Sequence, residues 1–197
     1  MILAGGENRR MNRLKAFIKI GGIPIIERQA AALAFFDELL VIAKDPAPYE
    51  SLGLTALPDD PEFSQLSVPL AGIYTGLKAA GNDYIFAVAC DMPFISGGLA
   101  RRLADLRHGH DAVVPVIGGY REPLFTLYSK TALSRAGEAL RGERLGLHRL
   151  FEDLNVLYVS EEELRVHDPE LLSFVNVNTP EELKIAEDLA RRRQKGR

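Results

Sequence analysis

Short apolar runs alternate along the chain with longer segments of helical periodicity. The runs rich in β-branched and aromatic residues predict strands at residues 39–43, 84–90, 112–116, 124–128, 156–159 and 174–177. Helices are predicted to begin near Pro24, Pro69, Gly98, Lys130 and Pro180. This alternation is typical of an α/β fold, in which helices cover a parallel sheet. We expect one domain over residues 1–197, because no repeat or linker interrupts the pattern.

Two of these segments carry more detailed signals. Residues 84–90 are apolar without alternation, which predicts a strand that is covered on both faces at the centre of the sheet. The last helix has Thr179 as a predicted N-cap and Glu182 three residues later, which is a capping-box arrangement. Its predicted buried stripe consists of Leu183, Ala186 and Ala190.

The first strand is unusually short. Only Ile2 and Leu3 precede the segment that leads into the glycine pair Gly5 and Gly6. A glycine loop in an α/β domain normally follows a full buried strand. We therefore expect a few residues upstream of Met1 in the native protein, which mass spectrometry would detect.

Composition and charge narrow the classes of function. The net charge of -3 and the pI near 5.9 provide no general attraction for nucleic acid or for an anionic membrane. No apolar run reaches membrane-spanning length, and Cys90 is the only cysteine, so we expect neither a membrane span nor an intrachain disulfide. A cytoplasmic protein that binds anions through local clusters fits these features.

The first local cluster surrounds the glycine pair. Gly5 and Gly6 let backbone N–H groups approach a ligand closely. Four basic residues follow within the next nine positions, namely Arg9, Arg10, Arg13 and Lys15. The segment matches neither the P-loop nor the dinucleotide GxGxxG pattern. It predicts a polyphosphate site of another kind, with a solvated basic loop as the alternative.

The second cluster lies at the end of the predicted central strand. Asp91 follows the apolar run directly, and Pro93 stops the strand. Ligands bind at the carboxyl ends of strands in open parallel sheets, and Mg²⁺ typically takes one or two carboxylates together with substrate phosphates. Asp91 is therefore a candidate magnesium ligand, although a carboxylate here also caps turns. Cys90 is interpreted as core packing.

Two further segments carry small or polar side chains. Gly72 and Gly76 leave one face of a predicted helix bare, so that either a neighbouring strand or a nucleotide approaches it closely. Asn176 and Asn178 alternate at the end of the predicted strand at residues 174–177, just before the capped helix. Their amides are suited either to a metal or phosphate shell or to hydrogen bonds within the turn.

In combination, these blocks resemble a known family. The chain contains LAGG followed by RRM and a lysine, then PLAGI, DMP, EPLF and VNVNTPEE, in the order found in molybdenum cofactor guanylyltransferases. The resemblance implies a three-layer α/β/α nucleotide-binding sandwich of the glycosyltransferase-A type, with a mostly parallel central sheet. It also implies Mg²⁺-dependent transfer of GMP from GTP to the terminal phosphate of molybdopterin or molybdenum-molybdopterin. Molybdenum-cofactor carrier proteins and recipient molybdoenzymes are the macromolecular partners that it suggests.

The resemblance also assigns roles to individual residues. It implies GTP binding by Leu3, Ala4, Gly5, Gly6, Lys15, Asp59 and Asp91. It implies catalysis by Lys15, Arg10 and Asp91, with Asp91 as the metal ligand. On the acceptor side it implies Asn176 and Asn178, together with an arginine that is either Arg144 or Arg149. The glycine pair favours guanine, because related cytidylyltransferases have LAAG at this point.

The chain departs from the family pattern at several positions that border the nucleotide. Asn12 stands in place of a glycine, Leu14 in place of an aspartate, Val68 in place of a glycine and Lys44 in place of an asparagine. Two alternatives therefore stay open. One is another nucleotidyltransferase of the same fold, acting as a cytidylyltransferase or on a sugar phosphate. The other is a non-catalytic relative that binds a nucleotide or molybdopterin.

Overall fold

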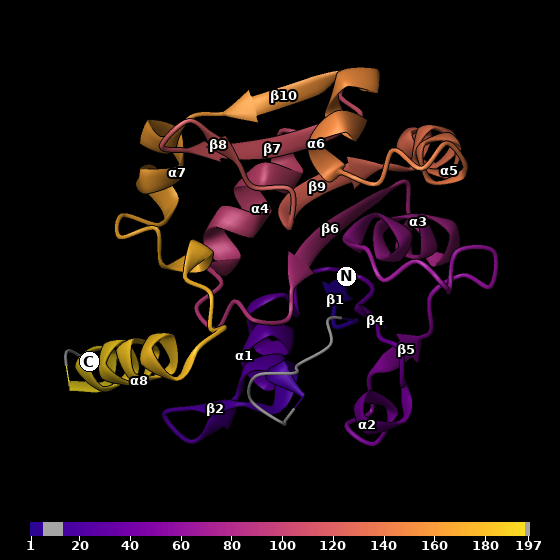
Figure 1. The fold of residues 1–197 in the computed structure, drawn as a ribbon. Helices are drawn as coiled ribbons and strands as arrows, with labels where there is room; N and C mark the ends of the chain where they lie inside the picture. Colours follow the sequence, from indigo (N-terminus) through magenta and orange to yellow (C-terminus); the bar gives the residue numbers. More distant parts are fainter. Residues whose placement is uncertain (6–13, 196–197) are drawn as a thin grey trace.

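The chain folds around a mixed β-sheet with the strand order β10-β7-β9-β6-β1-β4-β5 (Figure 1). A computed structural model describes residues 1–5 and 14–195. The strands of this path are β1 (Ile2–Leu3), β4 (Leu40–Ile42), β5 (Thr55–Leu57), β6 (Tyr84–Ala89), β7 (Ala112–Ile117), β9 (Phe125–Ser129) and β10 (Val156–Val159). A short strand, β8 (Tyr120–Arg121), pairs with the end of β7, and β2 (Lys19–Ile20) and β3 (Ile23–Pro24) form a separate hairpin.

The predicted central strand, β6, lies in the middle of this order, as expected. It pairs in parallel with β1, where Val88 lies opposite Ile2, and antiparallel with β9, where Val88 lies opposite Phe125. Strand β9 is antiparallel to both of its neighbours, while the other strands of the path run parallel to one another. The sheet is therefore mostly parallel, and the start of β9 lies at the edge where β6 ends.

Helices cover both faces of the sheet in three layers, which confirms the expected fold class. One face packs against α1 (Ile25–Ala32), α4 (Gly97–Asp105) and α7 (Glu161–His167). The other face packs against α3 (Pro69–Ala79), α5 (Leu133–Arg141) and α6 (Leu147–Leu150). The helices lie on these faces because each buries an apolar stripe: Ile26, Leu99, Leu103 and Leu164 on the first face, and Leu70, Ile73, Leu77, Ala136 and Leu140 on the second. A one-turn helix, α2 (Ala47–Glu50), follows β4.

The C-terminal helix α8 (Pro180–Lys195) packs beside the β2–β3 hairpin and α1, away from the sheet faces (Figure 1). Its capping box forms as predicted: the Glu182 amide donates to Oγ1 of Thr179 at 3.2 Å, and the Thr179 amide donates to Oε2 of Glu182 at 3.0 Å. Ala186 and Ala190 are buried against Ile20, and Leu183 is partly buried beside them. No helix in the described part of the chain is long and apolar enough to cross a membrane.

The prediction of a strand at residues 174–177 is wrong. A 3₁₀ helix occupies Leu172–Phe174, and the segment that follows joins no sheet. The alternation that suggested a strand has another cause, because Val177 is buried in the small core beneath α8 and its amide donates to the carbonyl of Asp91 at 2.9 Å. Asn176 and Asn178 therefore lie in a loop tied to the end of β6.

Other boundaries differ less. The helix predicted near Gly98 begins at Gly97, and a 3₁₀ turn at Lys130–Ala132 precedes α5. The helices α2, α6 and α7 and the strand β5 had not been predicted. Each has only three to seven residues, and this is too short for periodicity to stand out.

Candidate active site

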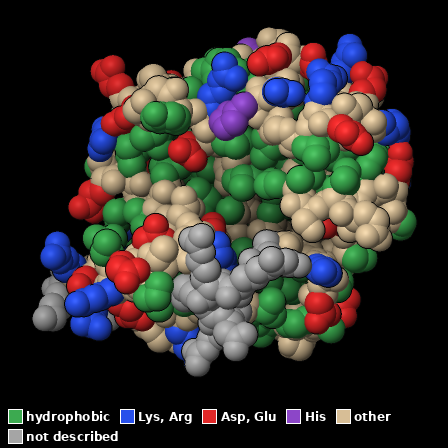
Figure 2. All heavy atoms as spheres, viewed as in Figure 1, with side chains coloured by type: hydrophobic (Ala, Val, Ile, Leu, Met, Phe, Trp, Pro, Cys, Tyr) green, Lys and Arg blue, Asp and Glu red, His purple; other side chains and the backbone are tan. Residues whose placement is uncertain are grey.

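The site lies at the edge of the sheet where four neighbouring parallel strands end. After β1 comes Gly5, after β4 comes Lys44, after β5 comes Asp59 and after β6 comes Asp91. A cavity of about 210 Å³ opens here, lined by Leu3, Gly5, Lys15, Ile42, Lys44, Asp59, Ser64, Ser67, Val68, Pro69, Gly72, Ala89, Cys90, Asp91 and Leu124. Figure 2 shows a hollow in the surface near the end of β6, with basic side chains at its rim.

Three side chains from distant parts of the chain meet beside this cavity, and two of them, Lys15 and Asp91, line it. Lys15, which begins a 3₁₀ helix, places its Nζ 3.0 Å from Oδ2 of Asp91 and donates a second hydrogen bond to Oδ1 of Asn178. The Lys15 and Asp91 side chains are 21% and 17% exposed. Partial burial strengthens such a charge-assisted pair relative to a surface ion pair. The structure thus brings together three of the residues that the sequence had singled out.

The backbone around Asp91 is held on several sides. The amide of Ala89 donates to the carbonyl of Leu124, and the amide of Cys90 donates to the carbonyl of Leu3 at 3.0 Å. The carbonyl of Asp91 accepts from Val177. The Asp91 side chain therefore points from a constrained backbone, which favours a defined ligand geometry.

Asp59 is the second carboxylate of the cavity. Its oxygens lie beside the bare backbone of two glycines: a Cβ atom built on Gly72 would be 3.7 Å from Oδ1, and one on Gly5 would be 4.0 Å from Oδ2. Burial raises the pKa of the Asp59 carboxyl above its ordinary value, because loss of solvent disfavours the charged form. A carboxylate at this place can accept hydrogen bonds from a ligand that enters the cavity.

We expect Asp59→Asn to stabilise the ligand-free protein at neutral pH. The folded protein binds the proton of Asp59 more tightly than the unfolded chain, so ionisation of this group opposes folding as the pH rises above about 3.8. Below that pH both states are protonated and the variant gains nothing. Urea unfolding at neutral and at acidic pH checks this. Equal free energies of unfolding for the two proteins at neutral pH would contradict it.

The bare helix face at Gly72 is approached by β1. A Cβ atom on Gly72 would lie 2.6 Å from Cδ2 of Leu3, so the strand side chain occupies the space that the glycine leaves. The corresponding atom on Gly76 would collide with the sulfur of Met1. The sequence left open whether a neighbouring strand or a nucleotide approaches this face. The structure shows that strand β1 approaches it, although Gly72 also lines the cavity.

We expect Gly72→Ala to destabilise the fold by about 1–3 kcal/mol, because the added methyl group overpacks against Leu3. Thermal unfolding measures this change. Ala71→Gly, one residue away in the same helix, controls for helix propensity. A Gly72→Ala protein as stable as the wild type would show that Leu3 moves aside freely.

Several predicted residues lie elsewhere. Asn176 is exposed. Arg144 pairs with Asp153 at 2.9 Å, Arg149 is exposed, and neither arginine lines the cavity. Gly6, Arg10 and Asn12 lie outside the described residues. The structure leaves the roles assigned to these residues as predictions.

Cys90 packs in the core, as predicted, and it also lines the cavity. Burial raises the pKa of its thiol to about 12, so the thiol stays protonated at neutral pH. A protonated, buried thiol is a poor nucleophile. Covalent catalysis by this cysteine is therefore not favoured.

The residues available to a metal are few. In the part of the chain that the structure describes, no three His, Cys, Asp or Glu side chains converge on one point. Asp91 offers one carboxylate, and the neighbouring Asn178 offers one amide oxygen. This sparse set of oxygen donors fits Mg²⁺, which keeps several waters and binds through one or two carboxylates plus substrate phosphates.

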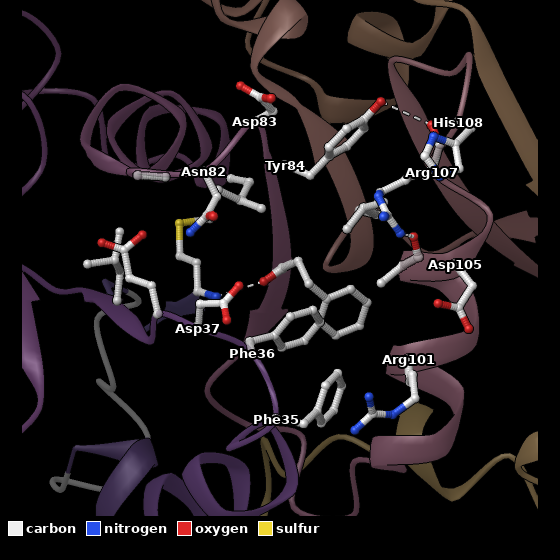
Figure 3. Close-up of a pocket in the computed structure, with 18 residues that line it drawn as sticks. Phe35, Phe36, Asp37, Asn82, Asp83, Tyr84, Arg101, Asp105, Arg107 and His108 are labelled. Atoms are coloured by element: carbon white, nitrogen blue, oxygen red, sulfur yellow. Dashed lines mark hydrogen bonds between the residues drawn. The ribbon is translucent and has the colours of Figure 1, made fainter.

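A larger cavity, of about 600 Å³, lies at the opposite edge of the sheet, where β6 begins (Figure 3). Phe35 stacks there on the guanidinium of Arg101 at 4.1 Å, and Tyr84 donates to the carbonyl of Arg107. None of the predicted site residues lines it. Its size alone therefore does not identify it as the site of chemistry, and its residues supply control variants.

Sequence reasoning missed some residues of the site. Ser64 and Ser67 line the cavity from the loop that precedes α3, and loop serines carry no distinctive pattern. Gln29 is fully buried beneath the loop that carries Asp91. A signal for it exists in the sequence, because Gln29 is a polar residue on the apolar stripe formed by Ile25, Ile26 and Leu33.

Comparison with known proteins identifies the family. Residues 1–158 match the model of the MobA-like NTP transferase domain. A probable molybdenum cofactor guanylyltransferase from Pelotomaculum thermopropionicum is 36% identical over 198 residues, which cover 100% of this chain and 95% of the relative. A molybdenum cofactor guanylyltransferase from Desulfosudis oleivorans is 35% identical, with 95% of this chain and 93% of the relative covered.

Solved structures agree with the sequence relatives. Molybdopterin-guanine dinucleotide biosynthesis protein A from Archaeoglobus fulgidus superposes with a TM-score of 0.83 at 29% identity, covering 97% of each chain. 2-C-methyl-D-erythritol 4-phosphate cytidylyltransferase from Thermus thermophilus shares the fold, with a TM-score of 0.71 at 23% identity over 96% of this chain and 98% of that one. The resemblance drawn from the motifs is confirmed, and the chain belongs to the family of nucleotidyltransferases that carry the MobA-like NTP transferase domain.

Proposed function

We propose that this protein transfers GMP from GTP to the terminal phosphate of molybdopterin, with or without molybdenum, releasing pyrophosphate. The observation that carries the proposal is the meeting of Lys15, Asp91 and Asn178 at the carboxyl edge of the sheet, beside a cavity that Lys15 and Asp91 line. The names of the relatives with full-length similarity support the choice of GTP and molybdopterin.

The nucleotide is proposed to lie over the ends of β1, β4 and β5. Gly5 presents backbone without a side chain, and Lys15 supplies a positive charge for the triphosphate. Lys44 lines the same cavity and provides a second cation where the family pattern has an asparagine. Asp59 is placed to accept hydrogen bonds from hydroxyl or amino groups of the nucleoside. Arg10, Leu3, Ala4 and Gly6 complete the proposed phosphate loop.

Asp91 and Asn178 are the residues that would hold Mg²⁺. When bound with the nucleotide, the metal supplies charge neutralisation at the phosphates. Lys15 pairs with the carboxylate of Asp91, so a cation held by that carboxylate would leave the ammonium of Lys15 available to the triphosphate. The pair thus keeps both charges compensated before substrates arrive.

The proposed reaction is a single in-line displacement. An oxygen of the acceptor's terminal phosphate forms a bond to the α-phosphorus of GTP, and the bond from that phosphorus to the oxygen bridging to the β-phosphate breaks. The electron pair leaves with pyrophosphate, which Lys15 and Arg10 stabilise. Such transfer depends on positioning and charge stabilisation more than on a strong base. No covalent enzyme intermediate is needed.

The acceptor is proposed to enter from the side of the loop that precedes α8. Asn178 joins this loop to the Lys15–Asp91 pair, and Asn176 is exposed two residues earlier. Arg144 and Arg149 remain the candidate phosphate contacts for the acceptor. Arg144 must exchange its ion pair with Asp153 to take that role.

The test is a nucleotide panel. Purified protein is incubated with molybdopterin, Mg²⁺ and each of GTP, CTP, ATP and UTP, while pyrophosphate release and the dinucleotide product are followed. The proposal expects molybdopterin guanine dinucleotide from GTP and loss of product when the metal is chelated. Product from CTP alone would identify a cytidylyltransferase, and GTP binding without turnover would identify a non-catalytic relative.

A further inference from the structure

Gln29 lies beneath the loop that carries Asp91. It belongs to α1, its side chain has no exposed surface, and its Nε2 donates to the carbonyl of Ala89 at 2.7 Å and to the carbonyl of Met92 at 2.9 Å. These carbonyls belong to the residues two positions before and one position after Asp91. One amide group therefore joins the two ends of the turn on which Asp91 sits.

The orientation of this amide is determined by its partners. Both neighbours are carbonyl oxygens, which only the NH₂ end of the side chain can serve. The Oε1 atom is buried and has no hydrogen-bond partner among the described residues. A buried polar atom without a partner costs free energy, so core packing alone does not account for a glutamine at this position.

The other contacts of the turn come from backbone. Leu3, Leu124 and Val177 each tie one of its amides or carbonyls from a neighbouring segment. Gln29 is the side chain that donates to two further carbonyls of the turn, those of Ala89 and Met92. Without its NH₂ group, the half-buried carbonyl of Ala89 and the buried carbonyl of Met92 would both lose this donor, which weakens the hold on the turn.

We infer that Gln29 is a positioning residue, which acts through Asp91 by fixing the turn that aims its carboxylate at the metal and the triphosphate. This inference rests on the proposed function, because it assigns Gln29 to the metal-binding turn of that same site. Residues that orient metal ligands typically change metal affinity or activity by about 10–100-fold when they are replaced.

Two substitutions separate this role from simple packing. Gln29→Met keeps the length of the side chain and removes the donors, while Gln29→Glu keeps the shape and sets a carboxylate against the two carbonyls. We expect the affinity for Mn²⁺, measured by electron paramagnetic resonance with the α,β-methylene analogue of GTP, to fall about tenfold in each variant. Hydrogen exchange should also become faster at the amides of residues 89–92.

The matched control is Tyr84→Phe. It removes one hydrogen bond from a side chain to a backbone carbonyl, that of Arg107 at 3.1 Å, at the opposite edge of the sheet. It should leave both Mn²⁺ affinity and exchange at residues 89–92 unchanged.

The outcomes are distinct. Folded Gln29 variants that bind Mn²⁺ as the wild type does would overturn the inference and leave the proposed function standing. A wild-type protein that binds no Mn²⁺ with the analogue would instead overturn the proposed function. If both variants fail to fold, Gln29 serves the fold and the inference is rejected.

Discussion

Asp91→Asn should lower the turnover rate by about 100-fold or more while the protein stays folded. Asparagine has nearly the same shape as aspartate and still offers Lys15 an acceptor oxygen. The hydrogen bond from Lys15, which is 3.0 Å long with Asp91, can therefore still form without the charge of the carboxylate. The backbone contacts of the turn through Leu3 and Val177 do not involve the side chain. What is lost is the carboxylate that pairs with Lys15 in this cavity, and with it the charge that would bind a hard cation.

Steady-state kinetics over a range of Mg²⁺ concentrations, together with circular dichroism, measure this effect. Glu163→Gln is the control, because it removes a carboxylate that pairs with Arg102 at 2.8 Å far from the cavity. The control should turn over normally. If the folded Asp91→Asn enzyme turned over at the wild-type rate, the proposed role of Asp91 would be wrong.

Lys15→Met should weaken GTP binding and reduce kcat/KM by an amount on the order of 100-fold. Methionine keeps much of the length of lysine but carries no charge, so the triphosphate loses a cation near its phosphates. The same change removes the ammonium that now occupies Asp91, so the carboxylate becomes more available to a metal. Lys15→Met should therefore lower the affinity for GTP. The affinity for Mg²⁺ without nucleotide should equal or exceed that of the wild type.

Isothermal titration with GTP and with Mg²⁺, carried out separately, tests this separation. The control is Lys78→Met, since Lys78 pairs with Asp60 at 2.7 Å on the exposed end of α3. A Lys15→Met protein with unchanged GTP affinity would remove Lys15 from the phosphate site. Lower affinity for the metal alone would contradict the proposed competition between Lys15 and the cation.

The sequence predicted the elements that have a strong local pattern. The central position of β6 followed from its unbroken apolar run, and the start of α8 followed from the capping box of Thr179 and Glu182. The antiparallel direction of β9 had no such signal, because alternation of apolar residues does not encode strand direction. The strand predicted at residues 174–177 failed because Val177 is buried against α8 rather than in a sheet.

The sequence singled out individual residues of the candidate site but not their arrangement. The glycine turn, Asp91 and Asn178 each carry the polar or flexible chemistry that marks a ligand site. Their convergence on Lys15 joins positions 76 and 163 residues apart, and no local pattern reports such contacts. Gln29 was overlooked because a single glutamine in an amphipathic helix usually faces solvent. Only the tertiary structure shows that it faces the Asp91 turn.

The central claim is that the turn after β1 and the carboxylate after β6 bind a triphosphate and its metal together. A crystal structure of the protein with the α,β-methylene analogue of GTP and Mg²⁺ tests this claim most directly. The account predicts the metal on Asp91, phosphate oxygens within hydrogen-bonding distance of Lys15, and the nucleoside beside Asp59. A nucleotide bound elsewhere, or Asp91 still paired with Lys15 and remote from the phosphates, would contradict it.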